Sequence, residues 1–181
     1  EFTDERKRTL IKMTGALMII TGTAFIGYLF DRFELYRMKD LENIKRALLF
    51  LKGEIDYMIA SLPVAMEEVG SRVGTNIGKI FSHVGESMKN KRGYSAEKLW
   101  KESVELYKDS TYLSKEDINN LLALGTALGY LDKEMQKNNI DLLLVYLEDE
   151  INRLKLHRHK NGRLYKTLGF LGGILIVILL Y

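Results

Sequence analysis

The hydrophobic and polar positions of this chain follow a helical spacing over most of its length. Between residues 39 and 62, apolar side chains recur every three or four positions, and charged residues lie between them. This spacing is typical of an amphipathic helix, because about 3.6 residues complete one turn. The apolar positions are Leu41, Ile44, Leu48, Leu51, Ile55, Met58 and Leu62. The helix is predicted to end just before Pro63, because the residue preceding a proline resists helical backbone angles.

Two shorter helices are predicted to follow. Pro63 suits the first turn of a helix, where its missing amide hydrogen costs little, and Gly74 is expected to end that helix after Val73. Thr75 or Asn76 can cap the next helix, which continues to about residue 90. The apolar face of this helix consists of Ile77, Ile80, Phe81 and Val84.

Serine residues mark where the next two helices begin. Ser95 and Ser114 each precede an amphipathic stretch, and serine is a preferred N-cap residue. Asp117 follows Ser114 at the third helical position and complements the exposed amide groups of the first turn. Gly125 lies inside the second helix at a cost in stability, so we expect another helix to cross closely there. Gly129 is expected to end this helix. Its predicted buried face is Ile118, Leu121, Leu122, Gly125 and Leu128.

A long helix is predicted from Asp132 to about Lys160. At about 1.5 Å per residue it would measure around 40 Å. Its apolar positions are Ile140, Leu144, Leu147, Ile151 and Leu154. Helices joined by short turns pack as antiparallel neighbours. The sequence therefore predicts an all-α fold, with a bundle of about six helices over residues 31–163.

Both ends of the chain are apolar, and a membrane helix is predicted at each. No charged residue occurs from Met13 to Phe30 or from Thr167 to Tyr181. These segments would measure roughly 27 Å and 22 Å, against about 30 Å for the hydrocarbon core of a bilayer. With flanking positions included, the predicted membrane helices are 10–30 and 164–181. A cleaved signal peptide is the alternative for the first segment, but no small-x-small cleavage site follows it.

Basic residues predict the orientation of these helices. A cluster of lysines and arginines precedes the C-terminal segment, and none follows it. The cluster consists of Arg153, Lys155, Arg158, Lys160, Arg163 and Lys166. Because the cytoplasmic side of a membrane helix carries the excess of lysine and arginine, we expect residues 31–163 to lie in the cytoplasm. The same cluster can contact anionic lipid headgroups.

Composition and motifs argue against several classes of function. The chain has 0 cysteines, which excludes disulfides and thiolate metal sites, and its net charge of +3 is too small to indicate nucleic-acid binding. His157 and His159 lie two positions apart on a helix and point in different directions, and His83 is remote in sequence. The sequence contains no phosphate-binding loop and no nucleophile elbow. We therefore expect no enzymatic activity, cofactor, metal, nucleic acid or small-molecule substrate.

Small residues in the C-terminal apolar segment predict close helix packing. Gly169 and Gly173 form a G-x-x-x-G pair, a spacing that lets two helices approach closely. The partner helix can be the N-terminal apolar segment of the same chain, where Thr23 and Gly27 have a similar spacing.

Four stretches of the chain form a recognisable series. They are Ile11-Lys-Met-Thr-Gly-Ala-Leu-Met-Ile-Ile, Glu54-Ile-Asp-Tyr57 with Leu62-Pro63-x-Ala65, Leu124-Gly125-x-x-Leu128-Gly129-x-x-Asp132-x-x-x-Gln136, and Tyr165-Lys-Thr-Leu-Gly-Phe-Leu-Gly-Gly173. In this order and spacing they resemble the stage III sporulation protein AB family of endospore-forming bacteria. The resemblance extends from about Leu10 to Tyr181. Residues 1–9 have no counterpart and are expected to be an N-terminal extension outside the family.

The resemblance implies a role in a membrane complex that links mother cell and forespore during engulfment. The helical domain of the family resembles the cytoplasmic domain of the platform protein of type II secretion and type IV pilus machines. By that likeness the partners are a secretion-type ATPase, stage III sporulation protein AA, and other subunits of the same complex. The motif positions carried over are Glu54, Tyr57, Pro63, Gly129, Asp132 and Gln136. They serve either partner contact or helix turns and caps, since several are standard turn and cap formers.

Two further interpretations stay open at this point. A membrane-anchored helical sensor or regulatory module would need an extracytoplasmic ligand-binding part, and the predicted outside segments are short. A small membrane enzyme would need buried polar groups in its membrane helices.

Overall fold

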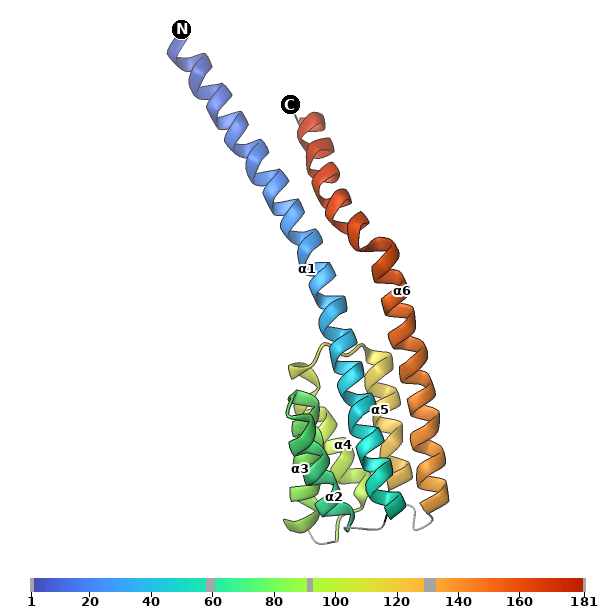
Figure 1. Ribbon diagram of the computed structural model, residues 1–181. Helices are drawn as coiled ribbons and strands as arrows, with labels where there is room; N and C mark the ends of the chain where they lie inside the picture. Colours follow the sequence, from blue (N-terminus) through green and yellow to red (C-terminus); the bar gives the residue numbers. More distant parts are fainter. Residues whose placement is uncertain (1, 58–60, 91–92, 129–132, 181) are drawn as a thin grey trace. The chain divides into compact units, whose positions relative to one another are not determined.

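The computed structural model describes residues 2–57, 61–90, 93–128 and 133–180, and every element in these ranges is helical (Figure 1). Within them, side chains are described except at 2–12, 24, 27, 30, 31, 133, 159–166, 168–170, 179 and 180. The elements are α1 (Phe2–Tyr57), α2 (Leu62–Val73), α3 (Asn76–Asn90), α4 (Ala96–Tyr107), the 3-10 helix η1 (Lys108–Ser110), α5 (Lys115–Leu128) and α6 (Lys133–Leu180). The prediction of an all-α fold is confirmed for the described residues.

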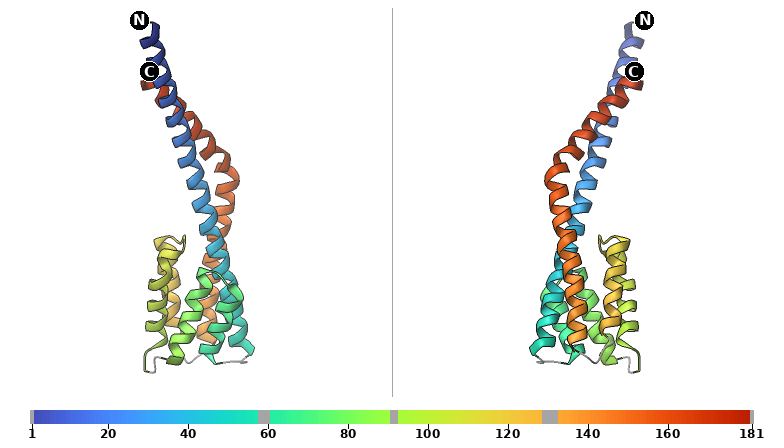
Figure 2. Two further views of the ribbon diagram at one scale, coloured as in Figure 1. Left: turned by 90° about the vertical axis from the view of Figure 1, so that its left-hand side faces the viewer. Right: turned by 90° about the vertical axis from the view of Figure 1, so that its right-hand side faces the viewer.

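The chain divides into two compact units, and α1 and α6 contribute a segment to each. One unit, here the helical bundle, is Tyr36–Arg153. The other, here the terminal unit, combines Glu1–Leu35 with Leu154–Tyr181. In the bundle, helices α2 to α5 lie beside the later part of α1 and the earlier part of α6, as Figures 1 and 2 show.

The core of the bundle is built from the apolar stripes that the sequence indicates. Leu41, Ile44, Leu48 and Leu51 on α1 are all buried, as predicted. Every α-helix of the bundle contributes to this core. Its largest fully buried side chains include Trp100, Phe81, Leu41, Ile44, Leu48, Leu51, Met66, Ile77, Ile80, Leu99, Leu121 and Ile140. Removing one such side chain to alanine costs about 2–5 kcal/mol in other proteins, so the core is the main source of stability here.

The turns between helices follow the expected boundary residues. Ser61 precedes α2, Pro63 lies in its first turn, and Gly74 after its end has a left-handed backbone with φ 65°. Ser95 caps α4, since its side chain accepts a hydrogen bond from the Lys98 amide at 3.2 Å. The predicted end of α5 at Gly129 and the predicted beginning of the long helix at Asp132 lie outside the described residues.

Helices α2 and α3 touch through their backbones. A Cβ atom placed on Gly78 would lie 2.5 Å from the carbonyl oxygen of Gly70, and one on Gly85 would lie 2.5 Å from that of Pro63. Real Cβ atoms do not approach other atoms so closely, so these positions require glycine. The spacing of Gly78, Ser82 and Gly85 marks this contact in the sequence, where it was not recognised.

The close crossing predicted at Gly125 is confirmed, and the partner is Trp100 of α4. A Cβ atom on Gly125 would lie 2.7 Å from Cδ1 of the indole ring. The indole Nε1 donates a hydrogen bond to the Leu121 carbonyl at 2.7 Å, and Phe81 meets the ring edge-to-face with 5.1 Å between centroids. Two predicted buried positions of α5, Ile118 and Leu122, are only half-buried. They line a surface groove between α5 and the α4–η1 segment, because α5 is covered by α4 on that side only in part.

In the part of the chain whose side chains are described, no helix is both long and apolar enough to cross a membrane. The predicted membrane helices at 10–30 and 164–181 include positions outside that part.

Candidate functional site

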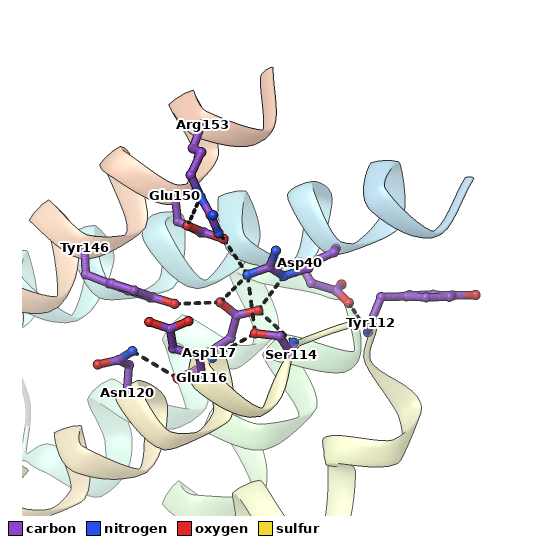
Figure 3. A network of polar contacts seen from close by, with 10 residues as sticks. Asp40, Tyr112, Ser114, Glu116, Asp117, Asn120, Tyr146, Glu150 and Arg153 are labelled. Atoms are coloured by element: carbon purple, nitrogen blue, oxygen red, sulfur yellow. Dashed lines mark hydrogen bonds and ion pairs between the residues drawn. The ribbon is translucent and has the colours of Figure 1, made fainter. Parts of the chain in front are cut away.

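A network of charged side chains joins α1, α5 and α6 inside the bundle (Figure 3). The Nε atom of Arg37 on α1 donates to Asp117 on α5 at 2.7 Å, and its Nη2 atom donates to Glu150 on α6 at 2.6 Å. The side chains of Arg37, Asp117 and Glu150 are only 13%, 1% and 9% exposed. We call these three residues, with Arg153, the ion cluster.

The carboxylate of Asp117 accepts hydrogen bonds from several residues. Its carboxylate accepts hydrogen bonds from the Ser114 amide at 2.7 Å and from the Tyr146 hydroxyl at 2.8 Å, besides those from Arg37. The Asp117 amide in turn donates to the Ser114 hydroxyl at 3.2 Å, which completes a capping box at the beginning of α5. Burial favours the protonated acid, but the hydrogen bonds from Arg37, Ser114 and Tyr146 outweigh it and lower the pKa of Asp117 below its ordinary value.

Glu150 is held by two arginines. Arg153 donates to both of its oxygens, at 2.8 and 2.6 Å, and Arg37 donates to one of them. The hydrogen bond from Arg153 is the largest cause that lowers the pKa of Glu150, and it outweighs the opposing effect of burial. The hydrogen bond to Asp117 is the largest cause that raises the pKa of Arg37. Two cations thus face two carboxylates, and all four groups are charged at neutral pH.

The ion cluster has the properties of a structural clamp. A catalytic acid or base usually has a pKa moved toward neutrality, and here the pKa values of the carboxylates move the other way. Tyr146 is no acid at physiological pH either, because burial and its bond to Asp117 raise the pKa of its hydroxyl. The geometry therefore ties α1, α5 and α6 together and offers no group that exchanges protons near pH 7.

The pair His83 and Ser103 resembles a base and a nucleophile but is not arranged as one. The Ser103 hydroxyl donates to the Leu99 carbonyl at 2.8 Å, so its single hydrogen is already used. His83 Nδ1, 2.8 Å from the same oxygen, must therefore donate to it. An imidazole that donates to a hydroxyl cannot remove its proton through that nitrogen. This pair packs α3 against α4.

Metal ligands do not converge in the described part of the chain, where no group of three or more His, Cys, Asp or Glu side chains could hold an ion. His157 lies 3.5 Å from Glu34, both in the terminal unit, and the side chain of His159 is outside the described residues.

Four of the six motif residues, which serve either partner contact or helix turns and caps, lie on elements that meet at one end of the bundle. Helix α1 ends there, and α2 and α6 begin there (Figure 1). Glu54 is nearly buried and lies 3.6 Å from Arg72, whereas Tyr57, the last residue of α1, is 78% exposed. Pro63 opens α2 and Gln136 is half-buried on α6. Gly129 and Asp132 lie outside the described residues.

Of the two glycines expected to pack in the terminal unit, Gly173 lies against α1. A Cβ atom on Gly173 would lie 2.5 Å from Thr23 Oγ1 and 3.0 Å from Ile20 Cα. The adjacent Gly172 has open space around the same position. The surroundings of Gly169 are outside the description.

The ion cluster itself was missed from the sequence. Glu150 follows Glu148 and Asp149 in the sequence, and such a run of acidic residues usually lies on a solvated face, but Glu150 is only 8% exposed. The signal was available in the spacing. Arg37 precedes Leu41 by four positions on the apolar stripe of α1, and Glu150 shares the buried face of Leu147 and Ile151 on α6. A charge on an apolar stripe needs a buried partner of opposite sign.

Comparison with known proteins adds the following. The family model described as stage III sporulation protein AB matches residues 12–181. The stage III sporulation protein AB of Bacillus subtilis (strain 168) is 28% identical over 171 residues, which covers 94% of this chain and 99% of that protein. A solved structure of a stage III sporulation protein AB aligns with a TM-score of 0.64 and 24% identity, and covers 69% of this chain and 98% of that one. At this identity the structural likeness shows the fold.

Proposed function

Because the chain belongs to the stage III sporulation protein AB family, we propose that it is a non-enzymatic membrane platform in the complex that links mother cell and forespore. In this role its terminal unit anchors the protein in the mother-cell membrane. Its helical bundle faces the cytoplasm and docks the secretion-type ATPase of the complex, stage III sporulation protein AA, together with other membrane subunits.

The single observation that carries the proposal is the exposed apolar surface of the terminal unit. Single exposed leucines are ordinary in soluble proteins, but a run of them along two helices that touch at Gly173 and Thr23 is not. The residues of this surface include Met13 at 66%, Leu17 at 64%, Met18 at 77%, Phe25 at 60%, Leu171 at 54%, Leu175 at 60% and Ile178 at 72% exposure. Each Å² of such surface removed from water contributes about 25 cal/mol, so a lipid environment favours it strongly.

The distribution of basic residues supports the proposed orientation. Arg153, Lys155 and Arg158 precede the C-terminal apolar stretch, and the stretch from Thr167 to Tyr181 itself carries no lysine or arginine. A cluster of lysine and arginine beside an apolar helix is typical of its cytoplasmic flank.

We place the ATPase contact at the end of the bundle where α1 ends and α2 and α6 begin. Tyr57 is among the most exposed large side chains of the bundle and stands next to the motif residues there. Exposed tyrosines are frequent anchors of protein interfaces, because a rigid ring buries a large area at little entropic cost.

Co-purification tests the proposal. The full chain, tagged and expressed during sporulation, is extracted from membranes with mild detergent and probed for the ATPase. Tyr57→Ala should reduce the recovered ATPase about tenfold, as expected for loss of an anchor residue. Tyr112→Ala is the control, since Tyr112 is 41% exposed and lies between η1 and α5, which meet at the opposite end of the bundle (Figure 1). Release of the wild-type chain by alkaline carbonate, or absence of the ATPase from the wild-type sample, would refute the anchor or the docking role respectively.

A further inference from the structure

Aromatic residues recur along α1 just where its apolar stretch ends. Tyr28 and Phe33 are 41% and 51% exposed, and Tyr36, the first residue of the bundle, is half-buried. Within the bundle, the ring of Tyr112, between η1 and α5, stacks on that of Tyr36 with 4.8 Å between the centroids. We call Tyr36 and Tyr112 the tyrosine pair.

The position of Tyr112 is fixed by two contacts with α1. Its backbone amide donates a hydrogen bond to Oδ2 of Asp40 at 2.8 Å (Figure 3), and its ring lies on Tyr36 with an interplanar angle of 27°. The Tyr112 side chain is still 41% exposed. A ring that is held in place and partly open is preordered for a contact, because covering its exposed surface costs little further side-chain entropy.

The spacing along α1 places the tyrosine pair near the level at which the apolar stretch ends. Tyr36 follows Phe30, the last residue of that stretch, by six positions of the same helix. At about 1.5 Å per residue the two positions are about 9 Å apart. Side chains of a helix lean toward its N-terminus, so the Tyr36 ring leans back toward this level. With Met13 to Phe30 in the hydrocarbon core, the headgroup layer covers about the next 5–7 Å, within reach of the ring.

We propose that the tyrosine pair lies in the phospholipid headgroup layer, so that the segment between η1 and α5 makes a third membrane contact besides α1 and α6. This inference rests on the membrane anchor of the proposed function and adds a contact made by the bundle itself. Tyrosine is enriched at membrane–water interfaces, because its ring is apolar and its hydroxyl is polar.

The charges around Tyr112 are mixed, so they do not select an anionic surface. Exposed Lys39 and Lys115 are matched by exposed Asp109 and Glu116, and Lys108 is paired with Glu105 at 2.6 Å. The headgroup layer is selected instead by the short distance along α1 and by the aromatic rings. The contact should therefore form with zwitterionic lipid alone.

Photo-cross-linking identifies what covers Tyr112. Benzoylphenylalanine, a photoreactive residue that keeps an aromatic ring, replaces Tyr112 in the full chain reconstituted in phosphatidylcholine vesicles. Mass spectrometry after illumination should find at least about tenfold more phospholipid adduct than with the same residue in place of Tyr94. Tyr94 is 50% exposed and precedes α4 at the opposite end of the bundle (Figure 1). Equal yields, absence of lipid adducts at Tyr112, or adducts only to a second copy of the chain would overturn the proposal.

Lipid composition separates the aromatic contact from attraction by charge. Addition of phosphatidylglycerol to the vesicles should change the yield of lipid adduct at Tyr112 by less than about twofold. An adduct that forms only with this anionic lipid would refute the role of the tyrosine pair.

A depth measurement tests the native side chain. The chain has 0 cysteines, so a fluorophore on Ser110→Cys, an exposed position of η1, reports this end of the bundle. Lipids with a nitroxide on the headgroup should quench it. Tyr112→Glu in this background should lower the quenching by about half, because a carboxylate favours water over the membrane interface, and Tyr94→Glu should leave it unchanged. Unchanged quenching in Tyr112→Glu contradicts the assignment, provided that helical circular dichroism verifies the fold.

Extraction distinguishes failure of this inference from failure of the anchor. If the wild-type chain resists alkaline carbonate but benzoylphenylalanine at Tyr112 labels no lipid, the membrane anchor stands and the third contact does not. If carbonate releases the wild-type chain, the anchor is refuted and this inference with it.

Discussion

Removal of Arg37 should be among the most damaging single changes in the bundle. The side chain is 13% exposed and bonds both Asp117, which is 1% exposed, and Glu150, which is 9% exposed. In Arg37→Leu, Asp117 loses its cation, and Glu150 keeps only that of Arg153. Deleting one partner of a buried ion pair typically costs about 3–5 kcal/mol. For a domain of this size, that corresponds to a lowering of the melting temperature by roughly 10–20 °C.

Thermal unfolding of the full chain in detergent, followed by helical circular dichroism, measures this cost. The control is Lys108→Leu, because Lys108 and Glu105, which form an ion pair at 2.6 Å, are 39% and 43% exposed. Exposed pairs contribute little, so this variant should lower the melting temperature by only a few degrees.

A compensated variant distinguishes loss of charge balance from loss of packing. In Arg37→Leu combined with Asp117→Asn and Glu150→Gln, no buried carboxylate is left without its cation. Replacement of a whole buried ion cluster is often nearly neutral, so much of the lost stability should return. The reasoning is refuted if Arg37→Leu costs less than about 1 kcal/mol, or if the compensated variant is no more stable than Arg37→Leu.

The remaining predictions concern pH and four glycines. The pKa values of Asp117 and Glu150 are lowered in the folded state. Their contribution to the free energy of unfolding is therefore present above the unfolded pKa values near 4 and is lost as the pH falls through the folded values. The stability of the wild type should drop steeply below about pH 4, and the stability of the compensated variant should drop less. Gly125→Ala should destabilise the bundle by about 1–3 kcal/mol in chemical denaturation, because the new methyl group meets Trp100 at 2.7 Å. Gly53→Ala, with nothing within 4 Å, should instead stabilise α1 by about 0.5–1 kcal/mol, and the opposite ranking of the two would contradict the packing argument. Gly173→Leu should lower the melting temperature of the full chain in detergent more than Gly172→Leu does, since only Gly173 lies against α1.

Local signals in the sequence were sufficient for the helices of the bundle. Pro63, Gly74, Ser95 and Ser114 act on their immediate neighbours, so their effects can be deduced without knowledge of the fold. Gly125 could be recognised as a crossing point because glycine is unfavourable within a helix.

Contacts between residues that are far apart in the sequence could not be predicted from it. Asp117 was understood as a cap, which it is, but its partner Arg37 is 80 positions away. No local pattern states which of many arginines will meet a given carboxylate. Likewise, a groove lined by Ala123 and Leu142 forms only where α5 and α6 meet. Such features depend on how separate elements meet, which one sequence does not specify by periodicity alone.

The location of the ion cluster along the chain has a mechanical consequence. Arg37 is the second residue of the bundle on α1, and Glu150 and Arg153 are among its last residues on α6. A long helix that leaves one folded body for another is weakest where side-chain support stops. At this level an ion pair joins α1 to α5 through Arg37 and Asp117, and a second joins α1 to α6 through Arg37 and Glu150. A force transmitted along either helix therefore acts first on these ion pairs, and acts on the apolar core only after the ion pairs break.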